Sequence, residues 1–316
     1  MSRFAALLGP GADQPDTSRR VEADLARRTG QPPHRWGSEG IQLWQAGTSV
    51  ARSFGPLTLA GDLALTDLGE LRAALAADRE TDPAGLVLAA WRRWGVEALD
   101  RLCGGFAFAL WDARVRRLTV VRDRFGIQPL TYAATQNRVV IAGDLSTVLA
   151  GLDAAPEIDR AWVAGFLSSQ TLDAARTAWK GVLRLSPGHL MVVESDGTTT
   201  LRPWYRLERT APPEARDAGA ALHAALAHAT LQACADGPTA TMLSGGLDSS
   251  TLALLSVGPD APGPQPRPAL SLRYRDPAMD EGRYIGDVLQ GDFYTYTGIT
   301  TAARPVQERL PLKIGA

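Results

Sequence analysis

The sequence has few of the residues that build metal sites and disulfide frameworks. It contains only two cysteines, Cys103 and Cys234, and four histidines. No pair of cysteines has the spacing of metal ligands, so neither a zinc site nor a disulfide framework is expected. His223 and His228 lie five positions apart on a predicted helix, where packed or solvated side chains are more common than metal ligands.

Long apolar runs are also missing. No run approaches the length that spans a membrane. Residues 4–8 are too short for the core of a signal peptide, and Gly9-Pro10 ends them. The formal net charge of −1 favours neither a nucleic-acid nor a membrane partner. We therefore expect a soluble, cytoplasmic protein that binds neither, with a homodimer left open.

Lysine occurs only at Lys180 and Lys313, although lysine and arginine together number 33. Because no lysine follows the glycines of the chain's glycine-rich turn, a nucleotide loop that ends in Gly-Lys-Ser/Thr is excluded. The remaining composition, 45% hydrophobic and 21% charged, is that of an ordinary globular protein. A length of 316 residues suggests two domains.

The turn itself is Ser244-Gly245-Gly246-Leu247-Asp248-Ser249-Ser250, with apolar segments before and after it. This pattern predicts a buried strand, a tight turn and a helix start, the arrangement that gathers backbone N–H groups around an anion. The glycines let a phosphate approach the backbone, and the serines add hydroxyl donors. A carboxylate at Asp248 would repel phosphates unless a cation lies between them, which predicts Mg²⁺ bridging Asp248 to a pyrophosphate.

The first two-thirds of the chain predicts a layered α/β sandwich. Strand patterns cover residues 57–63, 104–111, 117–122 and 138–142, and helical patterns cover residues 68–77 and 83–94. Residues 104–111 are apolar on both faces, which is typical of a strand buried between layers. The first forty residues give no clear pattern.

The last third predicts a helix and a parallel βαβ unit. The helix covers residues 214–235, and its apolar stripe of Leu222, Leu226, Ala229 and Ala233 should pack beside the strand that precedes the turn. Residues 269–274 are expected to form the second strand of the unit.

Several motifs resemble those of the glutamine-hydrolysing asparagine synthetase family, and they occur along this chain in the same order as in the family. Residues 102–111 and 122–130 look like the core of its glutaminase domain, and residues 185–190 and 204–205 like the segments that close it. Residues 236–250 resemble the start of the synthetase domain. The glycine turn is similar to the pyrophosphate loop of enzymes that split ATP between its α and β phosphates to adenylate a carboxylate.

The resemblance implies an N-terminal-nucleophile-hydrolase αββα sandwich for residues 1–209 and an incomplete ATP-pyrophosphatase α/β domain for residues 210–316. It implies ATP and Mg²⁺ as cofactors. The nucleotide would contact Leu243, Ser244, Gly245, Gly246, Leu247, Asp248, Ser249, Ser250 and Leu272. The similarity stops near residue 290, whereas family members continue for a couple of hundred residues. The resemblance therefore implies a truncated chain with a poorly ordered tail.

The glutaminase half departs from the family at several positions. The family's nucleophile is an N-terminal cysteine, exposed when the initiator Met is removed, and Ser2 stands there in this chain. Of the family's Asn-Gly-Glu, this chain keeps Gly61 followed by Asp62 but loses the amide that would help hold an oxyanion. The loops at Arg35 and Asp82 depart too. We therefore expect Arg35, Gly61, Asp62 and Asp82 to mark a degenerate glutamine site without glutaminase activity.

Three functions follow from the resemblance. The first is an ATP-dependent ligase that adenylates a small-molecule or peptide carboxylate and forms an amide. The second is a cyclase of the lasso-peptide or β-lactam type, in which the substrate's own amine attacks. The third is an inactive remnant that at most binds nucleotide.

Overall fold

The computed structural model describes residues 3–47, 51–135, 138–170, 173–208, 215–235, 238–258 and 261–300. The chain divides into two compact units, Met1–Arg209 and Thr210–Ala316.

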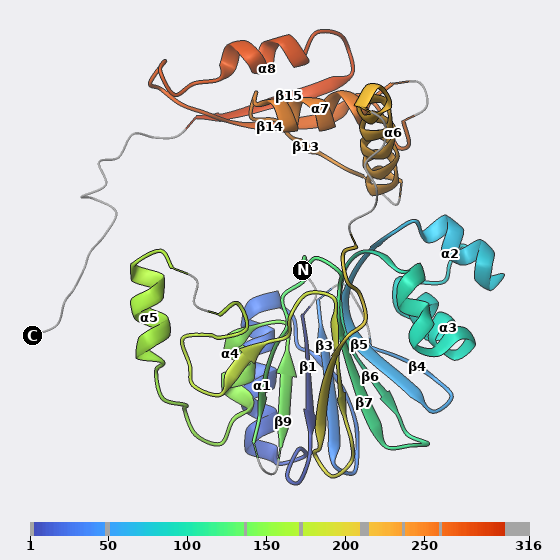
Figure 1. The fold of residues 1–316 in the computed structure, drawn as a ribbon, viewed down its shortest axis with the longest axis vertical. Helices are drawn as coiled ribbons and strands as arrows, with labels where there is room; N and C mark the ends of the chain where they lie inside the picture. The colour runs from blue at the N-terminus through green and yellow to red at the C-terminus, as the bar shows by residue number, and fades with distance from the viewer. Residues whose placement is uncertain are drawn as a thin grey trace, which may run out of the picture. The chain divides into compact units, whose positions relative to one another are not determined.

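Two six-stranded antiparallel sheets form the centre of the first unit (Figure 1). One sheet has the order β10-β8-β9-β1-β3-β2, and the other has the order β12-β11-β7-β6-β5-β4. The strands are β1 (Arg3–Leu8), β2 (His34–Ser38), β3 (Ile41–Ala46), β4 (Arg52–Phe54), β5 (Leu57–Thr66), β6 (Cys103–Asp112), β7 (Arg117–Arg122), β8 (Thr131–Ala134), β9 (Val139–Ala142), β10 (Val182–Arg184), β11 (His189–Val193) and β12 (Thr199–Pro203).

Helices cover the outer faces of both sheets. The helices of this unit are α1 (Pro15–Thr29), α2 (Leu68–Leu75), α3 (Pro83–Trp94), α4 (Leu145–Gly151), α5 (Arg160–Leu167) and a 3-10 helix (Gly95–Arg101). Helices α1 and α4 pack on the sheet that contains β1, and α2 and α3 pack on the sheet that contains β6 (Figure 1). The layer order is therefore αββα, and the predicted fold class is confirmed.

Strand β6 shows why the two sheets pack face to face. Its residues Phe106 and Phe108 are buried under α3, whereas Ala107 and Ala109 are buried between the sheets. A strand with both faces covered carries apolar residues throughout instead of an alternating pattern. The prediction of a strand buried between layers is confirmed.

The first forty residues, which gave no clear pattern, contain β1, α1 and β2. Helix α1 begins at Pro15 without a side-chain cap, because Gln14 precedes it, and ends at Gly30 with a φ of 71°. Its buried residues Val21 and Leu25 pack against the sheet. The sequence therefore carried a stop signal for this helix but no capping residue to mark its start.

The loop after β7 is built around one buried carboxylate. Asp123 is fully buried and accepts hydrogen bonds from the backbone N–H groups of Phe106, Phe125, Ile127 and Gln128, with N···O distances of 3.3, 3.1, 2.9 and 2.9 Å. Four charge-assisted hydrogen bonds fix the path of this loop.

The second unit is a three-stranded parallel sheet with the order β13-β14-β15. Its elements are α6 (Ala215–Cys234), β13 (Thr241–Met242), α7 (Leu247–Leu255), β14 (Arg267–Arg273), α8 (Gly282–Val288) and β15 (Tyr294–Thr300). Leu243, Ala253 and Ile285 form its small core. The predicted parallel βαβ unit is therefore present.

Two expectations for this unit were wrong. Residues 294–300, expected in a poorly ordered tail, form β15, which pairs with β14 over seven positions and packs Tyr294 and Tyr296 against the core. In α6, Leu222 is 62% exposed. Leu226 is only partly buried, and Ala229 and Ala233 are exposed, so the apolar stripe is not the packed face that the sequence predicted. The expected tail after residue 300 lies outside the described residues.

In the part of the chain that the structure describes, no helix combines the length and apolar character needed to cross a membrane.

Candidate functional site

The turn between β13 and α7 lies where parallel strands end. Because β13 and β14 run in the same direction, their carboxyl ends meet at one edge of the sheet. Residues 244–250 leave the sheet at this edge, and Arg273 ends β14 there. In open parallel sheets, ligands bind outside the carboxyl ends of the strands.

Gly245 gives the turn its shape. Its φ of 88° lies in the left-handed region, which residues with a Cβ rarely adopt. A Cβ at this position would lie 3.0 Å from Cβ of Glu281 and 3.2 Å from Cβ of Tyr284. The turn therefore packs closely against the start of α8 and requires glycine at this position.

The start of α7 is open to an anion. Gly246 occupies the N-cap position and has no side chain to cap the first N–H groups of the helix. The first N–H groups of a helix point outward along the axis and carry partial positive charge. The backbone N–H groups of Leu247 and Asp248 therefore suit a phosphate group.

The serines of the turn bond mainly to one another. The hydroxyl oxygens of Ser244 and Ser249 lie 2.8 Å apart, and the N–H of Gly246 donates to Ser244 Oγ at 3.3 Å. Ser249 Oγ also donates to the carbonyl oxygen of Gly246 at 3.2 Å. These two hydroxyls brace the loop from within and accept hydrogen bonds from the N–H groups of Ser244 and Gly246, so the N–H groups of Leu247 and Asp248 are its freer donors.

The other predicted nucleotide-site residues differ in exposure. Asp248 is exposed, and Leu247 is 83% exposed. Leu272 is half exposed near the end of β14, whereas the side chain of Leu243 packs in the core. The sheet edge thus offers the carboxylate of Asp248 and the apolar side chains of Leu247 and Leu272 to a ligand, and a contact from Leu243 would have to come from its backbone.

A metal ion at this site would need ligands from outside the protein. Among the described residues, no group of three or more His, Cys, Asp and Glu side chains could hold a metal ion. A single carboxylate suits Mg²⁺ that is bound mainly by phosphate oxygens and water, as in many nucleotide sites. Asp248 fits that arrangement, and the Mg²⁺ site stays a prediction.

An ion pair at the same edge was not predicted. Arg273 donates from Nε to Asp280 Oδ1 at 2.8 Å and from Nη2 to Asp280 Oδ2 at 2.6 Å. These bonds hold the pKa of Asp280 well below its usual range and raise the pKa of Arg273. The pair ties the segment before α8 to the end of β14, which places Glu281 and Tyr284 against Gly245. The sequence did not predict this pair, because Arg273 lies in a strand and Asp280 in a turn, and no periodic pattern places the two residues together.

In the first unit, Asp62 lies at a buried cluster of charge. It projects from β5 on the same face as Ala60, toward the other sheet, and is 4% exposed. Arg3 Nη1 lies 3.7 Å from Asp62 Oδ2, and Arg3 Nε lies 2.7 Å from Asp144 Oδ2. Burial raises the pKa of Asp62 to about 7; Arg3 opposes the rise and Asp144 adds to it.

The other residues of the predicted glutamine site have different partners. Arg35 pairs with Glu22 of α1 at 3.6 Å, and Asp82 caps α3 and pairs with Arg52 at 2.7 Å. Helices α1 and α3 cover opposite faces of the sandwich. Only two residues of the set stay together, Asp62 and Gly61, which lie side by side in β5. Ser2 lies outside the described residues.

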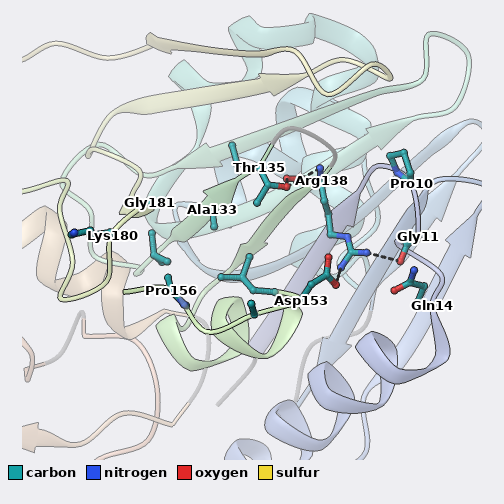
Figure 2. A pocket seen from close by; sticks show the side chains of 14 residues that line it. Pro10, Gly11, Gln14, Ala133, Thr135, Arg138, Asp153, Pro156, Lys180 and Gly181 are labelled. Atoms are coloured by element: carbon teal, nitrogen blue, oxygen red, sulfur yellow. Dashed lines mark hydrogen bonds and ion pairs between the residues drawn. The ribbon is translucent and has the colours of Figure 1, made fainter. Parts of the chain in front are cut away.

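A cavity in the first unit lies beyond the end of β1 that is opposite to Arg3. It has a volume of about 750 Å³ and is lined by Gly11, Thr135 and Arg138, among others (Figure 2). Arg138 is buried, and its guanidinium donates to Asp153 Oδ1 at 2.8 Å and to the carbonyl oxygen of Gly11 at 3.1 Å. These donors join the walls of the cavity, so they leave little charge for a ligand.

Two protein-family models match the chain, one in each of its two units. Residues 65–205 match the glutamine amidotransferase domain, and residues 221–290 match asparagine synthase. The first match falls within the sandwich, and the second includes the turn at Gly245.

Curated relatives agree with these matches. The amidase chyE of Penicillium rubens is 33% identical over 181 residues, which is 55% of this chain and 26% of the relative. Asparagine synthetase [glutamine-hydrolyzing] 3 of Bacillus subtilis is 29% identical over 194 residues, which is 60% of this chain and 31% of the relative. The matching part of this chain therefore spans about a third or less of the length of either relative.

Similarity to solved structures is weaker. A glutamine phosphoribosylpyrophosphate amidotransferase from B. subtilis aligns with a TM-score of 0.42 and 13% identity, covering 81% of this chain and 63% of that chain. This level of similarity supports no functional comparison.

Proposed function

We propose that this member of the glutamine-hydrolysing asparagine synthetase family binds the pyrophosphate end of ATP in its second unit. Its first unit does not hydrolyse glutamine, because Ser2 stands in place of the family's cysteine nucleophile. The observation that carries the proposal is the turn at Gly245, which delivers an uncapped helix start to the carboxyl edge of a parallel sheet. The reaction that we propose for this site is ATP-dependent formation of an amide from a small-molecule or peptide carboxylate.

The residues of the turn have separate roles in this proposal. Gly245 and Gly246 bring the N–H groups of Leu247 and Asp248 to the phosphates. The carboxylate of Asp248 holds Mg²⁺ against the same phosphates. Leu272 offers an exposed apolar surface to the adenosine. Bound ATP would supply an activated phosphate for adenylation of the carboxylate.

The order of ligand affinities tests this proposal. A fluorescent ATP analogue bound to the protein in the presence of Mg²⁺ should be displaced by pyrophosphate and by ATP. Because AMP lacks the β and γ phosphates that the turn recognises, it should compete at least about tenfold more weakly. If AMP displaces the analogue as well as pyrophosphate does, the site recognises the adenosine end and the proposal is wrong.

Glutamine hydrolysis should be absent from the first unit. Ser2 replaces the cysteine nucleophile, and the next residue, Arg3, makes ion pairs with Asp62 and Asp144. A serine hydroxyl is a weaker nucleophile than a thiol and needs a well-placed base. Incubation with glutamine, followed by assays of glutamate and ammonia, should give the same background for the wild type and for Ser2→Ala. Turnover that Ser2→Ala abolishes would contradict the proposal.

The amine that forms the amide would then come from a source other than glutamine. Without ammonia from glutamine, the attacking amine is free ammonia or an amine of the substrate. The second source gives ring closure, as in cyclases of the lasso-peptide and β-lactam type.

A further inference from the structure

The edge strands of the three sheets differ in charge. The edges of the two sheets of the first unit are β10, β2, β12 and β4, and each of these strands carries an arginine. The four arginines are Arg184, Arg35, Arg202 and Arg52. Strand β13, one edge of the second unit's sheet, is only two residues long. Charged side chains and short length are two ways in which edge strands avoid pairing with another chain.

Strand β15, the other edge of the second unit's sheet, has neither protection. It is seven residues long and contains no charged residue and no proline. Six of its seven residues are β-branched or aromatic, the types that favour pairing in a sheet. Among the described strands, β15 pairs with β14 alone. Its outer edge therefore offers unpaired backbone groups to another strand.

One hydrogen bond shows which backbone groups of β15 face outward. The N–H of Arg267 in β14 donates to the carbonyl oxygen of Phe293, which directly precedes β15, at 2.8 Å. Because the backbone groups of successive residues in a strand point to opposite sides, the odd-numbered residues of β15 bond toward β14. The residues whose N–H and C=O groups face outward are Tyr294, Tyr296, Gly298 and Thr300.

We propose that a second copy of this chain binds this edge, and that the two β15 strands pair antiparallel about a two-fold axis at Thr297. This register pairs all seven residues of each strand, and Tyr296 exchanges N–H···O bonds with Gly298 of the second copy. It also places Ile299, which is 58% exposed, beside Thr295 of the second copy. A copy of the same strand brings no charged residue to the contact, and such an isologous contact closes as a dimer.

A charge at the centre of β15 tests the proposal. Sedimentation velocity of the 316-residue protein over a concentration series should show a monomer–dimer equilibrium. Thr297→Arg places two arginines directly opposite each other at the axis, so it should raise the dissociation constant of the dimer at least about tenfold. Circular dichroism should stay unchanged, because the side chain of Thr297 is exposed. The contact does not require nucleotide at the turn of residues 244–250.

The matched control is Thr200→Arg, which adds the same charge to an exposed position of the edge strand β12. It should leave the dissociation constant unchanged. A protein that is monomeric at every concentration, an open-ended series of oligomers, or equal dissociation constants for Thr297→Arg and the wild type would each overturn the proposal.

A disulfide tests the register of the two strands. At the axis, Thr297 and its copy form a non-hydrogen-bonded pair whose Cα atoms lie ~4.5 Å apart, a distance that permits a disulfide. Under mild oxidation, Thr297→Cys should therefore give a covalent dimer on non-reducing gels. Thr200→Cys and the wild type, whose own cysteines are Cys103 and Cys234, should not. Equal cross-linking of Thr297→Cys and Thr200→Cys would contradict the pairing of the β15 strands.

Discussion

Asp123→Ala should lower the free energy of unfolding of the first unit by about 4 kcal/mol or more, since it strips the acceptor from four backbone N–H groups and each buried unsatisfied donor costs about 1–3 kcal/mol. The wild-type carboxylate is fully buried at the centre of the loop that follows β7. Its loss should free the loop and leave a polar cavity beside Phe106, whose N–H is one of the four donors.

Urea unfolding, monitored by tryptophan fluorescence, reports on the first unit, because all eight tryptophans lie before residue 210. The matched control is Asp196→Ala, which removes an exposed carboxylate that accepts one backbone N–H, from Thr198 at 2.8 Å. We expect the control to lose no more than about 1 kcal/mol. A loss below that level for Asp123→Ala would contradict the role given to its carboxylate.

The second large effect is expected at Gly245. Gly245→Val should weaken binding of ATP and pyrophosphate by about 100-fold or more, because the loss of several phosphate contacts removes at least ~3 kcal/mol. Valine cannot adopt a φ of 88° without strain, and its Cβ would meet Glu281 and Tyr284. The turn would have to reorganise, and its N–H groups would no longer converge.

Gly286→Ala in α8 is the matched control, since a Cβ there would meet nothing within 4 Å. It should bind nucleotide like the wild type. Circular dichroism should show unchanged helix content for both variants. A folded Gly245→Val protein that binds within threefold of the wild type would contradict the geometry assigned to the turn.

The elements that could be predicted from sequence carry local signals. Helix α3 has Asp82 as a capping residue, Pro83 in its first turn and Gly95 at its end, and it spans the predicted residues. Strand β1 has a stop signal at Gly9-Pro10, but its apolar run is too short for periodicity to distinguish a strand from a helix. Strand β15 was missed because threonine and tyrosine alternate there without an apolar run, and its pairing with β14 decides its structure.

The same contrast holds for the two sites. The turn from Ser244 to Ser250 is contiguous, and its backbone conformation follows from its own glycines, so the sequence was enough to predict it. The cluster of Arg3, Asp62 and Asp144 joins three segments that only the packing of two sheets brings together. Likewise, the pairing of Arg273 with Asp280 depends on the path of the chain into α8. No spacing rule reveals contacts of these kinds.

Calorimetric titration of the 316-residue protein with pyrophosphate, with and without Mg²⁺, tests the central claim most directly. If the turn holds a magnesium pyrophosphate group, the wild type should bind only when Mg²⁺ is present. Asp248→Asn, which keeps the shape of the exposed side chain but removes its charge, should weaken that binding at least about tenfold, the value of one charge-assisted contact. Equal affinity with and without Mg²⁺, or equal affinity of the wild type and Asp248→Asn, would contradict the assignment of the turn.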